Sequence, residues 1–214
     1  MIVRIAVENG WILKTPYREI GYRLEEIDKP YLTQEELTSI IEKELSIKRL
    51  NIIRDIFVFC CHTGLAFSDV KELTIENLQV GVDNNKWIIK KRHKTNIASK
   101  IPLPDTPAKI IEKYKDYPRS NNTTFLLPVP SNQKMNAYLK EIGDLAEIKK
   151  VLTTHTARRT FATTIMLQNG VNMEAVSKML GHTSLFMTRK YAKVDEYYIA
   201  QETEKVRKLF MKKD

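Results

Sequence analysis

The segment that decides the fold is residues 153–194, TTHTARRTFATTIMLQNGVNMEAVSKMLGHTSLFMTRKYAKV. Its apolar residues recur three and four positions apart, and glycines interrupt this pattern twice. The spacing predicts three helices, over residues 156–169, 172–180 and 185–191. His155 and Arg158 stand three positions apart where the first helix opens, so their side chains share a face beside backbone N–H groups that have no helical partner. Such a face suits a phosphate group.

Upstream, residues 73–104 change to alternating apolar and polar positions, which is the pattern of strands. Three strands are expected, over 73–80, 87–94 and 98–104, in a small antiparallel sheet rich in Lys and Arg. The remaining segments have helical spacing, and helices are expected over residues 33–41, 50–62, 105–115, 132–147 and 195–210, with a short helix capped by Ser68. The fold class is therefore α+β, mainly α-helical with a small antiparallel β-sheet.

The composition favours one main domain with a polyanionic partner. The 214 residues are 43% hydrophobic, enough to bury one sizeable core. The formal net charge of +9 favours nucleic acid or an anionic membrane surface as the partner. No apolar run approaches the roughly 20 residues that cross a bilayer, so a cytoplasmic location is expected. Cys60 and Cys61 are adjacent in an apolar segment, which predicts core residues and argues against a disulfide framework or a zinc site.

The chain is expected to divide near residue 30. Thr33 and Glu36 have the spacing of a capping box at the start of the main unit, which covers residues 31–214. Residues 1–30 hold a separate helix, over 2–12, and a polar stretch that is marked by proline and has no periodicity. This head is expected to be an appendage followed by a linker.

The order of the chemical motifs resembles the catalytic domain of the tyrosine recombinase (phage integrase) family. The His-x-x-Arg motif described above is followed by Gly181-His182 and, nine residues later, by Tyr191. Lys94 is near the tip of the predicted hairpin, before the segment ASKIPLP, where the family has its catalytic lysine. The resemblance extends over roughly residues 32–208, and the joint order of the motifs is hard to reach by chance.

The resemblance implies an enzyme that cuts and rejoins DNA. Tyr191 would attack a backbone phosphate and form a 3′-phosphotyrosine, while Arg158, helped by His182, would hold the phosphate. Lys94 would protonate the departing 5′-oxygen, and His155 would manage proton transfer around the nucleophile. Because such a cationic pocket neutralises the phosphate by itself, no cofactor and no metal ion are implied.

The turn after the second helix of the main unit departs from the family pattern. Most members have T-G-L-R there, with an arginine that contacts the scissile phosphate, whereas TGLAFSDV places Ala66 at that position. Losing such a cation from a phosphoryl-transfer site raises the barrier by several kcal/mol. Arg54 is the preferred substitute, because it opens the apolar helix that leads into this turn. A surface role beside Asp55 or Glu42 is the equally open alternative. Other candidate cations are Arg49, Lys71 and Arg159.

The resemblance also implies partners and surroundings. Residues 1–30 are similar to the last helix of the family's N-terminal core-binding domain with its linker, so the chain would lack most of that domain. The partner would be double-stranded DNA, on which the protein forms a tetramer, with the monomer as the state without DNA and accessory DNA-bending proteins as further partners. A mobile element or prophage is the expected source, and the nucleoid the expected location. The helix after Tyr191 would dock on a neighbouring protomer or fold back onto its own core.

Each motif also has a purely structural interpretation. A His-x-x-Arg pair at a helix start is usually a cap or a surface pair, and a basic hairpin is usually a solvated face. A histidine after glycine usually belongs to a helix C-cap, and Tyr191 could be a half-buried amphipathic ring. Two other functions stay open: a DNA-binding protein of the same fold that Ala66 leaves impaired in catalysis, and a type IB topoisomerase, which relaxes supercoils without site specificity.

Overall fold

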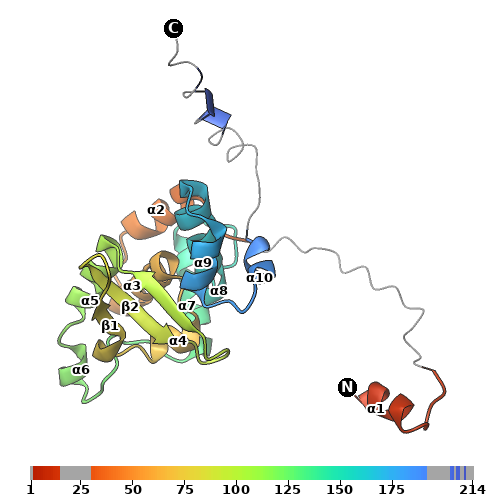
Figure 1. The fold of residues 1–214 in the computed structure, drawn as a ribbon. Helices are drawn as coiled ribbons and strands as arrows, with labels where there is room; N and C mark the ends of the chain where they lie inside the picture. Colours follow the sequence, from red (N-terminus) through yellow and green to blue (C-terminus); the bar gives the residue numbers. More distant parts are fainter. Residues whose placement is uncertain (1, 15–29, 192–202, 205, 208–209, 211–214) are drawn as a thin grey trace.

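The computed structural model describes residues 2–14, 30–191, 203–204, 206–207 and 210. Its main body consists of helices packed around a central helix, α3 (Lys48–Thr63), with a three-stranded antiparallel sheet along one side (Figure 1). The α-helices that contact α3 include α2 (Gln34–Glu42), α5 (Asp105–Lys113), α7 (Asn132–Leu145) and α8 (Thr154–Thr160), and the π-helix η2 (Phe161–Met166) contacts it as well. The predicted α+β class, mainly helical, is confirmed.

Helix α3 is central because its apolar residues surround it on nearly every side. Phe57 and Phe59 are fully shielded from solvent. Gly64 ends the helix in the left-handed region, at φ 65°, and a Cβ added there would meet the ring of Phe161 at 2.4 Å. Glycine is therefore required by the backbone conformation and by the close approach of a neighbouring segment. Both cysteines of the chain are buried in α3 with free thiols, as predicted for core residues.

The sheet has its strands in the order of the sequence: β1 (Leu78–Val80), β2 (Lys86–Lys91) and β3 (Ala98–Pro102). Ile88 of β2 pairs with Ile101 of β3, and both are fully buried, so this register fixes which face of the sheet covers the core. The first strand is shorter than predicted. Residues 75–77 of the predicted strand form the 3-10 helix η1 (Ile75–Asn77) instead, where Thr74 and Asn77 make a capping box.

The single helix predicted over residues 156–169 is divided into three parts. After α8, the chain changes to the π-helix η2 (Phe161–Met166) and the 3-10 helix η3 (Leu167–Asn169). The change coincides with hydrogen bonds from threonines to the backbone before α2: Thr160 Oγ1 accepts from the N–H of Leu32 at 2.9 Å, and the Thr164 hydroxyl donates to the Leu32 carbonyl. Contacts between such distant residues leave no trace in a local pattern.

The other helices are α1 (Ile2–Glu8), α4 (Phe67–Lys71), α6 (Tyr117–Ser120), α9 (Met173–Leu180) and α10 (Leu185–Arg189). The prediction that Ser68 caps α4 is wrong, because Ser68 is inside the helix and Ala66 occupies the N-cap position. The capping box of Thr33 and Glu36 at the start of α2 is confirmed. The helix predicted over residues 195–210 falls mostly outside the described residues. Of the helices that the structure describes, none has both the length and the apolar character needed to cross a bilayer.

Candidate active site

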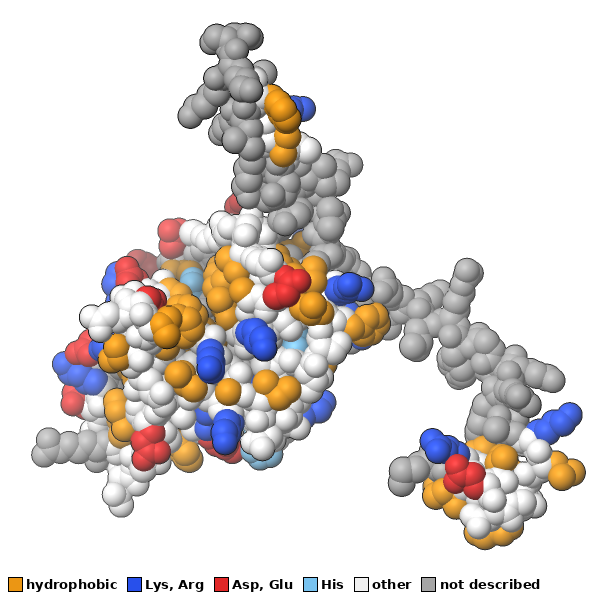
Figure 2. Space-filling view, viewed as in Figure 1, with side chains coloured by type: hydrophobic (Ala, Val, Ile, Leu, Met, Phe, Trp, Pro, Cys, Tyr) orange, Lys and Arg blue, Asp and Glu red, His pale blue; other side chains and the backbone are white. Residues whose placement is uncertain are grey.

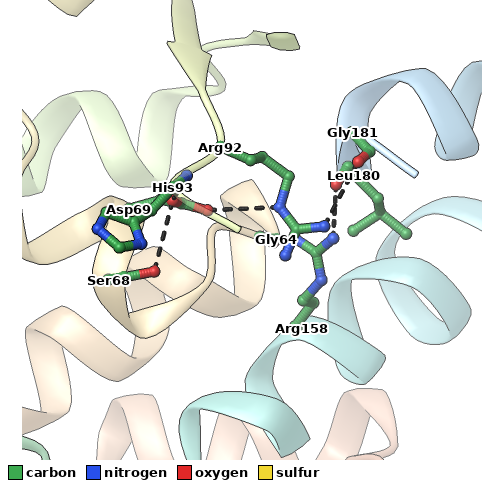
Figure 3. Close-up of polar contacts among 8 residues, drawn as sticks. All are labelled: Gly64, Ser68, Asp69, Arg92, His93, Arg158, Leu180 and Gly181. Carbon is green, nitrogen blue, oxygen red and sulfur yellow. Dashed lines mark hydrogen bonds and ion pairs between the residues drawn. The ribbon is translucent and has the colours of Figure 1, made fainter. Parts of the chain in front are cut away.

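Arg158 is at the centre of the candidate site, on α8, with only 4% of its surface exposed. Thr153 is the N-cap of this helix, and its hydroxyl accepts from the N–H of Thr156 at 3.1 Å. The Arg158 guanidinium donates to the carbonyl of Gly64 at the end of α3 and, at 2.5 Å, to the carbonyl of Leu180 at the end of α9 (Figure 3). One cation therefore joins the C-terminal ends of two helices, where the negative ends of the helix dipoles stabilise it.

The charge of Arg158 is held in a low-dielectric environment. Burial and the neighbouring charge of Arg92 lower the pKa of Arg158 to about 10, against an opposing effect of Tyr191 and Asp69. This value is still well above neutral pH, so the guanidinium stays charged. The hydrogen-bond acceptors that the described chain offers it are neutral oxygens. They satisfy its donors without cancelling its charge, which leaves the charge available to an anion.

His182 follows Gly181, the left-handed C-cap of α9. Its Nδ1 is 2.8 Å from Thr188 Oγ1 on α10. Its ring stacks on that of Tyr191, with 5.8 Å between the ring centroids and 21° between the planes. Burial lowers the pKa of His182 to about 4, and two nearby guanidinium groups contribute in the same direction. The imidazole is therefore neutral at pH 7.

Tyr191 is fixed at both ends of its backbone. Its N–H donates to the carbonyl of Thr188 at 2.9 Å, and its carbonyl accepts from the Thr163 hydroxyl of η2 at 3.0 Å. The ring is half-buried against the small apolar cluster of η2 and α9. Interaction with the Tyr191 side chain raises the pKa of Arg158, against the lowering by burial. The structure thus brings Tyr191, His182 and Arg158 together within one chain.

Lys94 and His155 are exposed. Lys94 is in the turn between β2 and β3, which is closed by the N–H of Arg92 on the carbonyl of Ile97 and by the N–H of Asn96 on the carbonyl of Arg92, both at 2.9 Å. His155 is on the first turn of α8, one turn before the buried arginine of that helix. Both side chains are accessible to a ligand as large as a DNA duplex.

The structure does not bring Arg54 to this cluster. Its guanidinium donates to the carbonyl of Lys43 and, at 2.9 Å, to Oδ1 of Asn51, in the connection from α2 to α3. Gly64, where the central arginine binds, is about 15 Å further along α3 at 1.5 Å per residue. These bonds give Arg54 a local role at the start of α3, with Lys43 and Asn51 as its partners in place of the expected Asp55 or Glu42.

The cation that the structure does place beside Arg158 is Arg92, directly after β2. Its Nε is 3.5 Å from Oδ2 of Asp69, and its Nη1 is 3.4 Å from the carbonyl oxygen of Gly181. Asp69 is buried and also accepts from the N–H of His93 at 3.0 Å. The sequence pattern marks Arg92 only as one of several basic residues of a hairpin. The signal that could have singled it out is Asp69, because a carboxylate in an otherwise apolar turn requires a cationic partner when it is buried.

Comparison with known proteins shows which family has this arrangement of residues. The sequence pattern of the phage integrase family matches residues 30–197, which include every residue of the cluster. The chain belongs to the phage integrase family. A tyrosine recombinase XerD of Staphylococcus haemolyticus is 31% identical over 150 residues, which are 65% of this chain and 49% of the relative. A tyrosine recombinase of Thermosipho africanus is 27% identical over 197 residues, 87% of this chain and 65% of the relative. This family member thus spans about half the length of the XerD relatives that it matches.

Solved recombinase structures share the fold of this phage integrase family member. The crystal structure of XerA recombinase aligns with a TM-score of 0.67 at 20% identity, over 95% of this chain and 80% of that one. A lambda integrase dimer bound to a COC′ core site aligns with a TM-score of 0.69 at 16% identity, over 90% of this chain and 69% of that one. Identities this low show the fold alone, and they confirm the predicted catalytic-domain fold.

Proposed function

We propose that this chain is the catalytic part of a site-specific DNA recombinase that cuts and rejoins DNA through a 3′-phosphotyrosine intermediate. The observation that carries the proposal is Tyr191 stacked on a neutral His182 beside the buried, charged Arg158, all within one chain. Attack on a phosphodiester needs an oxygen nucleophile, charge neutralisation and proton transfer. Tyr191 would be the nucleophile, and Arg158 with His182 would neutralise and bind the phosphate. The names of the relatives, tyrosine recombinases, support the same reaction.

Arg158 would hold the non-bridging oxygens of the scissile phosphate. A guanidinium has five N–H donors in a fixed plane, and two of the donor nitrogens are already held by the carbonyls of Gly64 and Leu180. These bonds fix the plane of the group before DNA arrives, so little reorganisation accompanies phosphate binding. When the Thr188 hydroxyl donates to Nδ1 of His182, Nε2 of the neutral ring carries the hydrogen and can donate it to a phosphate oxygen.

Tyr191 would attack phosphorus in line with the departing 5′-oxygen. The bond from its phenolic oxygen to phosphorus forms as the bond from phosphorus to the 5′-oxygen breaks, and the phenolic proton passes toward His155. The electron pair of the broken bond goes to the 5′-oxygen, which takes a proton from Lys94. Because the phosphotyrosine keeps the phosphodiester bond energy, a 5′-hydroxyl of another strand reverses the step and rejoins the DNA.

The partner in this proposal is double-stranded DNA. Figure 2 shows lysine and arginine side chains over the sheet and α9 on the face in view. Exposed lysines of these elements include Lys91, Lys100 and Lys178. With the net charge of +9, they would bind the phosphate backbone through charge, independently of base sequence.

The larger assembly belongs to the same proposal. On DNA the protein would form a tetramer, with accessory DNA-bending proteins as further partners, and DNA binding would place it at the nucleoid. Residues 1–30 would be the end of a core-binding domain with its linker. The relatives are about twice as long as their matched part, which supports a second domain in the complete reaction.

A covalent trap tests the function directly. The probe is a pool of duplexes of randomised sequence, each nicked near the centre so that the short fragment released after attack diffuses away and prevents rejoining. We expect a protein–DNA band on a denaturing gel that Tyr191→Phe abolishes. Tyr138→Phe is the matched control, because Tyr138 is on α7, outside the cluster, and should keep the band.

The same preparation separates the alternatives. DNA binding with no covalent band at any protein concentration would contradict the enzyme and favour a DNA-binding protein impaired in catalysis. Relaxation of a supercoiled plasmid that lacks every sequence recovered from the trapped pool would favour a type IB topoisomerase instead.

A further inference from the structure

The turn from α3 to α4 lacks the cation that the family pattern places there. Ala66 occupies the N-cap of α4, and its side chain has neither a charge nor a donor. Asp69 follows on the same short helix, with 1% of its surface exposed. A carboxylate buried this deeply is costly unless a cation or several donors satisfy it.

Arg92 reaches this turn from the sheet. Its backbone is fixed by the hydrogen bonds that close the β2–β3 turn, and its side chain, with 10% exposed, extends back toward α4 and α9 (Figure 3). Room for it exists because residue 181 is glycine: a Cβ there would be 2.6 Å from Cδ of Arg92. The guanidinium therefore occupies the space between Asp69 and the end of α9.

Arg92 and Arg158 form a pair of like charges. They donate to the consecutive carbonyls of Gly181 and Leu180, and Figure 3 shows the two guanidinium groups next to one another. Their mutual repulsion contributes to the lowered pKa of Arg158. The one carboxylate bonded to either of them in the described chain is Asp69. A phosphate bound between the two groups would relieve the repulsion that remains.

The contacts of Arg92 are also loose enough to leave donors for a ligand. Its distances of 3.5 Å to Asp69 and 3.4 Å to Gly181 exceed the usual 2.7–3.2 Å of N–H···O hydrogen bonds, whereas Arg158 is held at 2.5 Å. A purely structural cation in a buried ion pair would be expected to bond its carboxylate closely.

We propose that Arg92 is the second phosphate-binding guanidinium of this site, taking the place of the arginine missing at Ala66. It binds a non-bridging oxygen of the scissile DNA phosphate, and Asp69 positions it. This inference rests on the proposed recombinase function, and it makes Ala66 compatible with catalysis.

Four variants test the inference in the covalent trap. Arg92→Ala should slow formation of the covalent complex on the order of 100-fold, the cost of losing one donor to a developing phosphate charge. Arg92→Lys should give a rate between those of the unmodified protein and Arg92→Ala, because lysine keeps the charge but lacks the paired N–H donors of a guanidinium. Adding Ala66→Arg to Arg92→Ala should restore part of the rate. Arg49→Ala is the matched control, since Arg49 is 51% exposed and pairs with Glu141.

Stability is measured in parallel, because Arg92→Ala leaves Asp69 without its cation. If Arg92 were only structural, the rate of covalent-complex formation would fall only as far as the fraction of folded protein falls. Ala66→Arg would then restore the rate only if it also restored folding. Rate unchanged in folded Arg92→Ala overturns the inference while leaving the recombinase standing. Absence of any Tyr191-dependent band in the unmodified chain overturns the recombinase instead.

A readout that needs no cleavage uses inorganic phosphate. In ¹H–¹⁵N spectra of the unmodified protein, the Nε–H signals of Arg92 and Arg158 should shift together along one titration curve as phosphate is added. A shift of the Arg158 signal without the Arg92 signal, or of neither, contradicts a shared phosphate site.

Discussion

Arg158 holds the site together at the scale of single residues, and it does so as part of the fold. Its guanidinium satisfies carbonyls at the ends of α3 and α9 while it is 4% exposed. Removing it would leave buried carbonyls unpaired, which costs about 1–3 kcal/mol for each group. Substitution of Arg158 therefore mixes folding with catalysis, and neighbours that tune the site give cleaner tests.

Thr188 is such a neighbour. It is fully buried, and its hydroxyl is 2.8 Å from Nδ1 of His182. Thr188→Val keeps the shape of the side chain but removes this hydrogen bond, worth about 1 kcal/mol, so the covalent complex should form about fivefold more slowly. Thr188→Ser should restore most of the rate. Equal rates for valine and threonine, measured by single-turnover kinetics, would show that the hydroxyl does not orient the imidazole.

The pH dependence of stability tests the surroundings of His182. Burial, with Arg158 and Arg92, lowers its pKa from 6.5 to about 4 in the folded chain. As pH falls below 6.5 the unfolded chain takes up this proton and the folded chain does not, so stability that is complete above pH 6.5 is lost toward pH 4. His62, whose pKa burial also lowers, acts with the same sign.

His182→Gln removes one of these two contributions. The difference in unfolding free energy between pH 7 and pH 5, from urea denaturation, should be smaller in His182→Gln than in the unmodified chain. An identical difference in both proteins would mean that the imidazole is not shielded as the structure indicates.

Most residues of the candidate site could be predicted from the sequence, but Arg92 could not. The order of Lys94, His155, Arg158, His182 and Tyr191 carries the family resemblance, and the structure brings the last two beside Arg158. The cation that replaces the arginine missing at Ala66 could not be identified from the sequence. Spacing along a helix does not show which strand end packs against the turn that follows it. Spacing favoured a residue of α3, whereas tertiary packing supplies one from the β2–β3 turn.

At the scale of elements, helix ends set by local sequence were predictable, whereas changes of helix type that accompany tertiary contacts were not. The start of α2 follows from a capping box, and the end of α3 follows from a glycine. The conversion of a regular helix into α8, η2 and η3 accompanies contacts with Leu32, far away in the chain. That conversion also carries Thr163, which fixes the backbone of Tyr191.

Gly64 gives the element-scale prediction. Gly64→Ala forces an alanine to φ 65° and sets its Cβ 2.4 Å from Phe161, so the protein should lose about 2–4 kcal/mol of stability. Gly143→Ala is the matched control, because Gly143 is inside α7 and the nearest atom to its added Cβ is 3.4 Å away, in ordinary contact. Equilibrium denaturation measures both. A neutral effect of Gly64→Ala would contradict the close approach of α3 and η2.

At the scale of the whole molecule, charge and length set the expectation for DNA binding. The net charge is +9, and the chain covers about half of its XerD relatives. A protein that contacts one side of a duplex mainly through phosphates binds with strong dependence on salt and little dependence on sequence. This unit alone should therefore show charge-driven affinity more clearly than site preference.

Salt titration tests that expectation. Affinity for a labelled duplex should fall on the order of 10³-fold between 50 and 200 mM salt if about six phosphates are contacted. The double variant Lys100→Glu with Lys178→Glu should bind more weakly and with a shallower dependence on salt, because both lysines are exposed on the sheet and α9. Lys140→Glu, on exposed α7 surface, is the control. An equal loss in the control would place the DNA on another face.

The most direct test of the central claim is to find which tyrosine carries DNA. The covalent complex is digested with nuclease and protease, and the nucleotide-bearing peptide is sequenced by mass spectrometry. Of the nine tyrosines in the chain, Tyr191 alone should bear the adduct, through a 3′-phosphate. An adduct on any other tyrosine, or a trapped complex whose peptide carries a 5′-phosphate, would contradict this account of the site.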